Sequence, residues 1–175
     1  MYRCVALLSL AAPSHEPSEL ASAARIELPA GRVLLDEEDV TERIRSPEVS
    51  RAASWVAADP GVREAMVARQ REIMADGDWV AEGRDIGTVV APGADLKIFL
   101  TADEGERARR RAAELGQPQE SVLADQQARD RRDTEREHAP LRPSDGSVII
   151  DSTGLDAEQV IARIAALARG PRERF

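Results

Sequence analysis

Cysteine, aromatic residues and long apolar runs are all scarce in this chain. Cys4 is the only cysteine, which excludes an internal disulfide and leaves it too solitary for a metal site. This cysteine usage favours a reducing compartment, and we expect a cytoplasmic protein. The apolar runs fall far short of the ~20 residues that span a bilayer, so we expect no membrane partner. Aromatic residues make up 3% of the chain, so the core must be built from Ala, Val, Leu and Ile.

Lysine is almost absent, because Lys97 is the only one and lies inside an apolar run. A Walker-type phosphate-binding loop ends in Gly-Lys-Ser/Thr, so these 175 residues cannot contain one. The formal net charge is −8. This charge argues against binding nucleic acid through bulk electrostatics. The basic residues, nearly all of them arginine, must therefore act in local clusters.

The length of 175 residues suits a single domain with a substantial core. Residues 1–12 are mostly apolar and allow two interpretations, an apolar helix of the folded domain or a short secretory signal. We favour the helix, because Arg3 is the only positive charge and the apolar segment is at the short limit for a signal.

The next part of the chain predicts a small β-rich insert followed by two helices. Two alternating runs, residues 25–28 and 32–35, flank a Pro-Ala-Gly turn and predict a β-hairpin, to which residues 36–41 add a third short strand. A helical turn is expected at 19–24. The pairs Ser46-Pro47 and Asp59-Pro60 are helix-start signals, because Ser and Asp cap helices and Pro fits the first turn. They predict helices over residues 46–58 and 59–74.

The remaining chain alternates between strands and helices. Short apolar runs at residues 79–81, 96–100 and 147–150 are predicted strands. Helical patterns at 103–115, 119–137 and 156–168 separate or follow them. This alternation is typical of an α/β fold in which helices cover a parallel sheet.

Residues 80–88 form the stretch around which the predicted site is organised. A short apolar run leads into a loop with two glycines that carries Glu82, Arg84 and Asp85. Ligands of α/β proteins bind beyond the carboxyl ends of the strands, where such loops lie. The alternative is a surface turn with a solvated ion pair.

Arginines also cluster in two later segments. Arg129, Asp133 and Arg136 share one helix face, where they could hold a phosphate and a sugar hydroxyl, or form an exposed ladder of ion pairs. Residues 106–111 contain four arginines, which suit either a mobile lid over a polyphosphate or a solvated helix face. Residues 151–153 end the last predicted strand and could contact a nucleotide or simply begin a helix.

Together these segments resemble bacterial cytidylate kinase, a nucleoside monophosphate kinase. The resemblance covers most of the chain and its motifs occur in the family's order. They are residues 1–3, 31–35 with 38–41, 45–50, 82–88, 96–101, Arg129-Asp130-x-x-Asp133-x-x-Arg136 and 151–153.

The resemblance implies a fold of the P-loop nucleoside-monophosphate-kinase type, a parallel sheet with flanking helices. It places an inserted NMP-binding segment at residues 25–59, and a lid with its following helix at 103–137. The implied activity is phosphorylation of CMP or dCMP by ATP with Mg²⁺, in a protein that acts as a monomer.

The resemblance also assigns roles to individual residues. Ser54, Arg63 and Asp85 match positions that read cytosine. Arg3, Arg84 and Arg136 match ligands of the CMP phosphate, and Tyr2, Arg129 and Asp133 match the pentose site. Arg109 and Arg110 match the lid on the ATP side, and Glu82 a supporting position. Of these, Arg84, Arg129 and Arg136 are the implied catalytic residues.

The family's first strand, P-loop and helix have no counterpart in this sequence. We therefore expect an N-terminally truncated cytidylate kinase with impaired activity. The loss would also remove the strand between residues 79–81 and 96–100. The alternative is a CMP-binding or regulatory remnant without catalysis.

Overall fold

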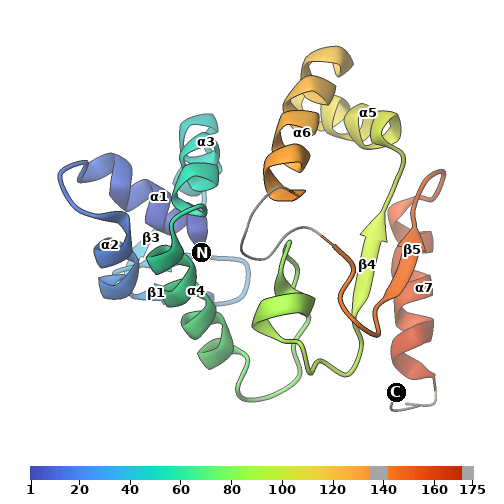
Figure 1. Cartoon of the computed structure of the whole chain (residues 1–175), viewed down its shortest axis with the longest axis horizontal. Coiled ribbons are helices and arrows are strands. Elements are labelled where there is room, and N and C mark those ends of the chain that lie inside the picture. The colour runs from blue at the N-terminus through green and yellow to red at the C-terminus, as the bar shows by residue number, and fades with distance from the viewer. Residues whose placement is uncertain (135–141, 171–175) are drawn as a thin grey trace. The chain divides into compact units, whose positions relative to one another are not determined.

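The computed structural model describes residues 1–134 and 142–170 of the chain (Figure 1). Near the end of helix α6 it describes the backbone alone at residue 129 and at 132–134. The chain divides into two compact units, Met1–Trp79 and Val80–Phe175, each of which is described by itself.

Four helices form most of the first unit: α1 (Tyr2–Ala11), α2 (Pro17–Ala23), α3 (Pro47–Val56) and α4 (Pro60–Ile73). The two predicted capping signals are confirmed. The Ser46 hydroxyl accepts a hydrogen bond from the Val49 amide at 3.2 Å, and the Asp59 carboxylate accepts one from the Val62 amide at 2.9 Å. These bonds satisfy amides that a helix leaves without a partner in its first turn.

The predicted hairpin and third strand are also confirmed. Strands β1 (Ile26–Glu27), β2 (Leu34–Leu35) and β3 (Glu38–Asp39) form an antiparallel sheet in the order β1-β2-β3. Asp36 and Glu37 join β2 to β3 with positive φ angles of 50° and 71°. The Asp36 carboxylate accepts from the Arg25 amide at 2.9 Å, which fixes this left-handed turn. A 3-10 turn, η1 (Arg43–Arg45), leads to α3.

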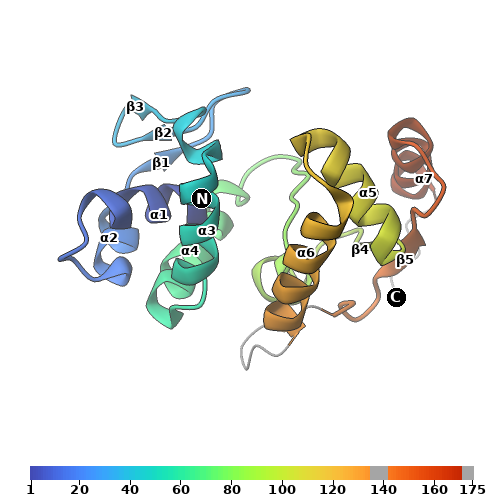
Figure 2. The same cartoon turned by 90° about the horizontal axis from the view of Figure 1, so that it is seen from above.

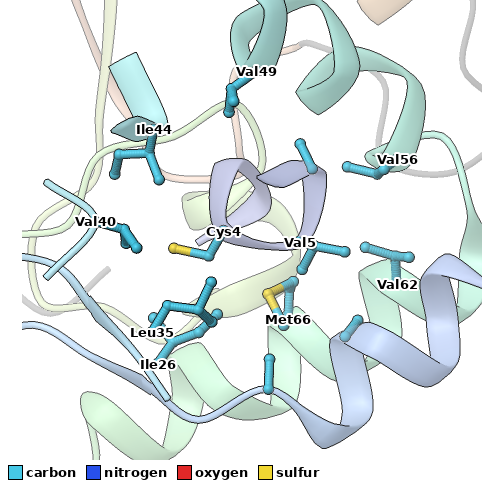
Figure 3. Packing of buried hydrophobic residues seen from close by; sticks show 13 residues of the cluster. Cys4, Val5, Ile26, Leu35, Val40, Ile44, Val49, Val56, Val62 and Met66 are labelled. Atoms are coloured by element: carbon cyan, nitrogen blue, oxygen red, sulfur yellow. The ribbon is translucent and has the colours of Figure 1, made fainter. Parts of the chain in front are cut away.

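Helix α1 lies at the centre of the first unit's core, as Figure 3 shows. Cys4 and Val5 are fully buried, and Met66 of α4 is 1% exposed. Around them pack Ile26 and Leu35 from the small sheet. The prediction that residues 1–12 form a helix of the folded domain is therefore confirmed.

The second unit contains a two-stranded parallel sheet with helices beside it (Figures 1 and 2). Strand β4 (Ile98–Thr101) pairs with β5 (Val148–Asp151) in the register Ile98↔Val148 to Thr101↔Asp151. Helices α5 (Glu104–Leu115) and α6 (Gln119–Thr134) connect the two strands and pack on each other, and α7 (Ala157–Arg169) follows β5. Parallel strands require such a crossover connection. The predicted α/β class with a parallel sheet is confirmed.

In the second unit, α5 and α7 begin close to residues 103 and 156, where the sequence predicts their starts. Asp103 caps α5 by accepting from the Glu106 amide at 3.1 Å, and Asp156 forms a capping box with Gln159 on α7. Gly116 ends α5 with a φ of 62°, a left-handed conformation that glycine adopts without steric cost. Among the described residues, no helix has both the length and the apolar character needed to cross a membrane.

The strand predicted at residues 79–81 is wrong. This segment has neither helix nor strand, and Trp79 is 51% exposed while Val80 is fully exposed. A strand needs a neighbour for its backbone hydrogen bonds. In the described residues β4 pairs only with β5, and residues 79–81 pair with neither strand, so this segment has no ladder of backbone hydrogen bonds.

Candidate active site

The loop formed by residues 82–88 carries Arg84 and Asp85 on a tightly turned backbone. A short π-helical turn, η2 (Ile86–Val90), begins directly after Asp85. The Asp85 carbonyl accepts from the Val89 amide at 2.8 Å, and the Thr88 hydroxyl donates to it at 3.3 Å. Asp85 is 8% exposed, whereas Glu82 is exposed. The turn therefore places a buried carboxylate next to a partly exposed arginine.

Glycine at position 87 allows close packing of this loop. A Cβ atom there would lie 2.7 Å from the Ser144 hydroxyl oxygen and 3.7 Å from Cδ of Lys97. The single lysine donates to the Pro92 carbonyl at 2.8 Å. The 82–88 loop is thus seated against the segments that precede β4 and β5.

Arg84 forms an ion pair with Asp130, a member of the Arg129–Arg136 motif to which the resemblance assigns no role. Its Nη2 donates to Oδ1 of Asp130 at 2.8 Å, and Nη1 of Arg107 donates to Oδ2 of the same carboxylate at 2.5 Å. Burial alone raises the pKa of Asp130, but the hydrogen bonds from Arg107 and Arg84 outweigh it and lower that pKa. The carboxylate is therefore held ionised between two guanidinium groups.

Polar contacts also join α5 to α6. Gln119 donates to the Gly105 carbonyl at 3.2 Å, and Gln127 donates to the Glu104 carboxylate at 3.0 Å. Between them lie buried small and apolar side chains, Ala108 and Ala112 of α5 and Val122 of α6. The helix pair is thus fixed by side chains on both helices, and Asp130 belongs to this pair.

The two arginines assigned to the lid have different surroundings on α5. Arg109 is exposed and donates twice to Glu106, at 2.7 and 2.8 Å. Arg110 donates to Glu106 at 2.8 Å and also reaches the carbonyls of Ser152 and Leu155, at 2.7 and 3.1 Å. Hydrogen bonds from Arg109 and Arg110 lower the pKa of Glu106 to about 2.

The segment after β5 is held by hydrogen bonds to the start of α5. The Thr153 hydroxyl accepts from the Asp103 amide at 2.8 Å and donates to the Asp151 carboxylate at 2.7 Å. These bonds from Thr153 lower the pKa of Asp151. Buried Ser152 donates its hydroxyl to the Thr101 carbonyl at 3.0 Å. Residues 151–153 therefore form a rigid strand end bonded to β4 and α5.

Four of the predicted site residues lie in the first unit. Tyr2 and Arg3 are in the first turn of α1, where Arg3 donates to the Ile44 carbonyl at 3.0 Å. Ser54 lies on α3, which packs on α1, and Arg63 lies on α4. All four are partly buried.

The remaining predicted residues cannot be placed fully. The backbones of Arg129 and Asp133 are part of α6, but their side chains are outside the described part of the structure. Arg136 lies outside the described residues altogether. Within the described part of the chain, no three His, Cys, Asp or Glu side chains gather in a way that could hold a metal ion.

Asp130 is the functional candidate that sequence reasoning missed. Its partners are distant in sequence, since Arg84 lies 46 residues away and Arg107 lies 23 residues away. The short turn between α5 and α6 was a usable signal, because it lies near the midpoint between Arg107 and Asp130 and brings the two helices together. Nothing comparable connects Asp130 to Arg84.

A family model described as cytidylate kinase matches residues 1–170. The chain belongs to the cytidylate kinase family. This result confirms the resemblance seen in the motifs, and it makes the chain a phosphotransferase by resemblance.

Curated relatives of this family are similar over nearly all of the chain. A cytidylate kinase from Solibacter usitatus is 45% identical, covering 97% of this chain and 78% of its own length. One from Pelotomaculum thermopropionicum is 44% identical, covering 99% of this chain and 84% of its own length. A bifunctional pantoate ligase/cytidylate kinase from Synechococcus is 44% identical over 99% of this chain, which spans 35% of that longer protein.

Proposed function

We propose that this chain binds CMP or dCMP as phosphate acceptor in the ATP-dependent reaction that yields CDP or dCDP. The observation that carries the proposal is the 82–88 loop of a cytidylate kinase family member, in which a partly exposed Arg84 directly precedes a buried Asp85. An arginine beside a buried carboxylate suits a ligand that has an anionic end and a hydrogen-bond donor.

Arg84 is the proposed ligand of the CMP phosphate, together with Arg3 and Arg136. The forked guanidinium matches phosphate oxygens and keeps its charge at every physiological pH. In phosphoryl transfer such cations hold the reacting groups in line and stabilise the charge that develops on them. We propose Arg129 as a further catalytic cation and, with Tyr2 and Asp133, as part of the pentose site.

Asp85 is the proposed reader of the base, with Ser54 and Arg63 as further cytosine contacts. A carboxylate accepts from the exocyclic amine of cytosine, whereas uracil presents a carbonyl at that position. The uracil carbonyl would face the Asp85 carboxylate in a buried site, and two acceptors turned toward each other cost free energy. A preference for CMP over UMP is therefore expected.

MgATP is the proposed donor, and Mg²⁺ enters with the nucleotide phosphates, as is usual for phosphoryl-transfer sites. Arg109 is exposed on α5. Its guanidinium is available to an ATP phosphate once its hydrogen bonds to Glu106 are broken. Arg110 would first have to release Ser152 and Leu155. We propose both arginines as ligands on the ATP side, in the segment 103–137 that comprises the lid and its following helix.

We also propose that turnover by the 175-residue chain is impaired. Its one lysine is bonded to the Pro92 carbonyl, and no Gly-Lys-Ser/Thr occurs in the sequence to hold the donor's β and γ phosphates. The purified chain is assayed for ADP formation with CMP and MgATP. We expect less than about 0.1 turnovers per second, against about 1–100 for ordinary kinases. Turnover in the ordinary range would contradict the impairment.

The second candidate function is a CMP-binding or regulatory module without catalysis. The absence of Gly-Lys-Ser/Thr from the 175 residues favours this module as much as it favours an impaired kinase. The two candidates differ in the DNA upstream of the Met1 codon. An in-frame segment of the form Gly-x-x-x-x-Gly-Lys-Ser/Thr there supports the kinase, and a stop codon directly before Met1 supports the binding module. CMP binding without any ADP formation also favours the binding module.

We further propose that the protein works as a cytoplasmic monomer without nucleic-acid or membrane partners. The net charge of −8 argues against nucleic-acid binding, the single, buried Cys4 fits a reducing compartment, and the monomer rests on the resemblance to the family. Size-exclusion chromatography with light scattering tests the monomer, and a mass near 38 kDa, twice the 19.1 kDa of one chain, would contradict it.

A further inference from the structure

Asp130 occupies the point where three segments of the second unit meet. Its Oδ1 accepts from Arg84 of the 82–88 loop at 2.8 Å, and its Oδ2 accepts from Arg107 of α5 at 2.5 Å. Asp130 itself lies on α6. The three side chains are 24–38% exposed, so solvent screens these ion pairs only in part. One carboxylate therefore links the loop to both helices.

This carboxylate is itself held in place. Arg107 donates to one of its oxygens from the second turn of α5, and the α5–α6 pair is further fixed by the hydrogen bonds of Gln119 and Gln127. An anchored acceptor restricts the rotamers of the long side chain that donates to it. The guanidinium of Arg84 is thus oriented by a carboxylate on a rigid helix pair, although Arg84 comes from a loop.

We propose that Asp130 is a positioning residue: it fixes the guanidinium of Arg84 in the orientation that receives the phosphate of the nucleoside monophosphate. The inference rests on the proposed function, because it takes Arg84 as a phosphate ligand. A guanidinium carries five N–H donors in a rigid fork, so one arginine can hold a carboxylate and a phosphate together. Preorganisation by Asp130 lowers the cost of ordering Arg84 when the ligand binds.

The test is the affinity of the full 175-residue chain for CMP and for cytidine, measured by calorimetry in wild type and Asp130→Asn. Asn keeps the shape but is neutral, and its NH2 group turns a donor toward one of the two guanidinium groups in place of an acceptor. We expect Asp130→Asn to weaken CMP binding about tenfold, as for loss of one charge-assisted bond, and to leave cytidine affinity within about twofold. Asp125→Asn is the matched control, since Asp125 is exposed on the same helix.

A double-mutant cycle distinguishes positioning from a general structural role. If Asp130 acts through Arg84, Asp130→Asn has no further effect on CMP affinity in an Arg84→Met background. Equal loss for CMP and cytidine, an unchanged CMP affinity, or the same penalty in both backgrounds would overturn the proposal.

A measurement without nucleotide separates this proposal from the proposed function. In the NMR spectrum of the wild-type chain, we expect the Arg84 guanidinium to be ordered, and to become mobile in Asp130→Asn but not in Asp125→Asn. A mobile Arg84 in wild type overturns the positioning role. If Arg84 is ordered but the chain fails to bind CMP, the proposed function is overturned instead. The role of Arg84 as a ligand of the CMP phosphate is then overturned as well.

Discussion

Carboxylates shared between two arginines recur in the second unit. Asp130 accepts from Arg84 and Arg107, and Glu106 accepts from Arg109 and Arg110. A carboxylate with two oxygens can bond two guanidinium groups at once, and each bond favours the ionised form. These four arginines are thereby held in defined positions.

Glu106 gives a direct test of this arrangement through pH. Hydrogen bonds from Arg109 and Arg110 lower its folded-state pKa from 4.5 to about 2. Because the pKa is lowered on folding, the stabilising contribution of Glu106 is complete above pH 4.5 and is lost as pH falls toward 2. At pH 3 we expect the ¹³C shift of the Glu106 carboxyl to keep its ionised value.

Glu106→Gln provides the control for that titration. The variant lacks the titrating group, so its unfolding free energy should fall less between pH 4.5 and pH 2.5 than that of wild type. A Glu106 midpoint near its unshifted pKa of 4.5 would show that the two arginines do not hold it.

Close packing between α2 and α4 is the corresponding feature at the scale of elements. Gly61 lies in the first turn of α4, and a Cβ atom there would be 2.7 Å from Cβ of Ser18 on α2. That distance is below any ordinary carbon–carbon contact, and the Ser18 Cβ is fixed to its backbone. The absence of a side chain at Gly61 therefore allows the two helices to approach.

We expect Gly61→Ala to destabilise the protein by about 1–2 kcal/mol in urea unfolding, because overpacking outweighs the better helix propensity of alanine. In a Ser18→Gly background the clash is gone, and the same substitution should become neutral or stabilising. A stabilising Gly61→Ala in the wild-type background would contradict the close packing of α2 on α4.

The elements that the sequence predicted well are those with local signals. Ser46-Pro47 and Asp59-Pro60 begin α3 and α4 because cap and first turn involve neighbouring residues. Alternation around residues 29–31 likewise predicted β1 and β2, since a hairpin pairs strands that are close in sequence.

The elements and contacts that the sequence did not predict correctly depend on partners that are distant in sequence. Trp79 to Ala81 has an apolar composition typical of a strand, but a strand also requires backbone pairing with a distant segment, and residues 79–81 join neither β4 nor β5. The pairing of Asp130 with Arg84 crosses 46 residues and leaves no local periodic signal. Short-range patterns could place Asp130 on a helix face, and nothing in them indicated which arginine it would bind.

At the scale of the whole molecule, the division between the two units falls in an exposed segment. Residues 76–83 are all exposed, and the boundary lies between Trp79 and Val80. Such a segment has little buried surface to lose on local opening, so it is accessible to proteases.

Limited proteolysis tests this with a control inside the chain. Chymotrypsin should cut after Trp79 first and release fragments 1–79 and 80–175. Trp55 is the control, because it is 64% exposed but lies within helix α3, so cleavage there requires the helix to unfold. Cleavage after Trp55 before Trp79 would contradict the description of residues 76–83 as the accessible segment.

The central claim, that the chain carries an acceptor site for CMP, is tested most directly by calorimetric titration of the 175-residue chain with CMP and with UMP. We expect CMP to bind at least about tenfold more tightly than UMP, because uracil would present a carbonyl oxygen, and cytosine an amine, to buried Asp85. Asp85→Asn should remove most of that preference. Absence of CMP binding, or equal affinity for CMP and UMP, would contradict the claim.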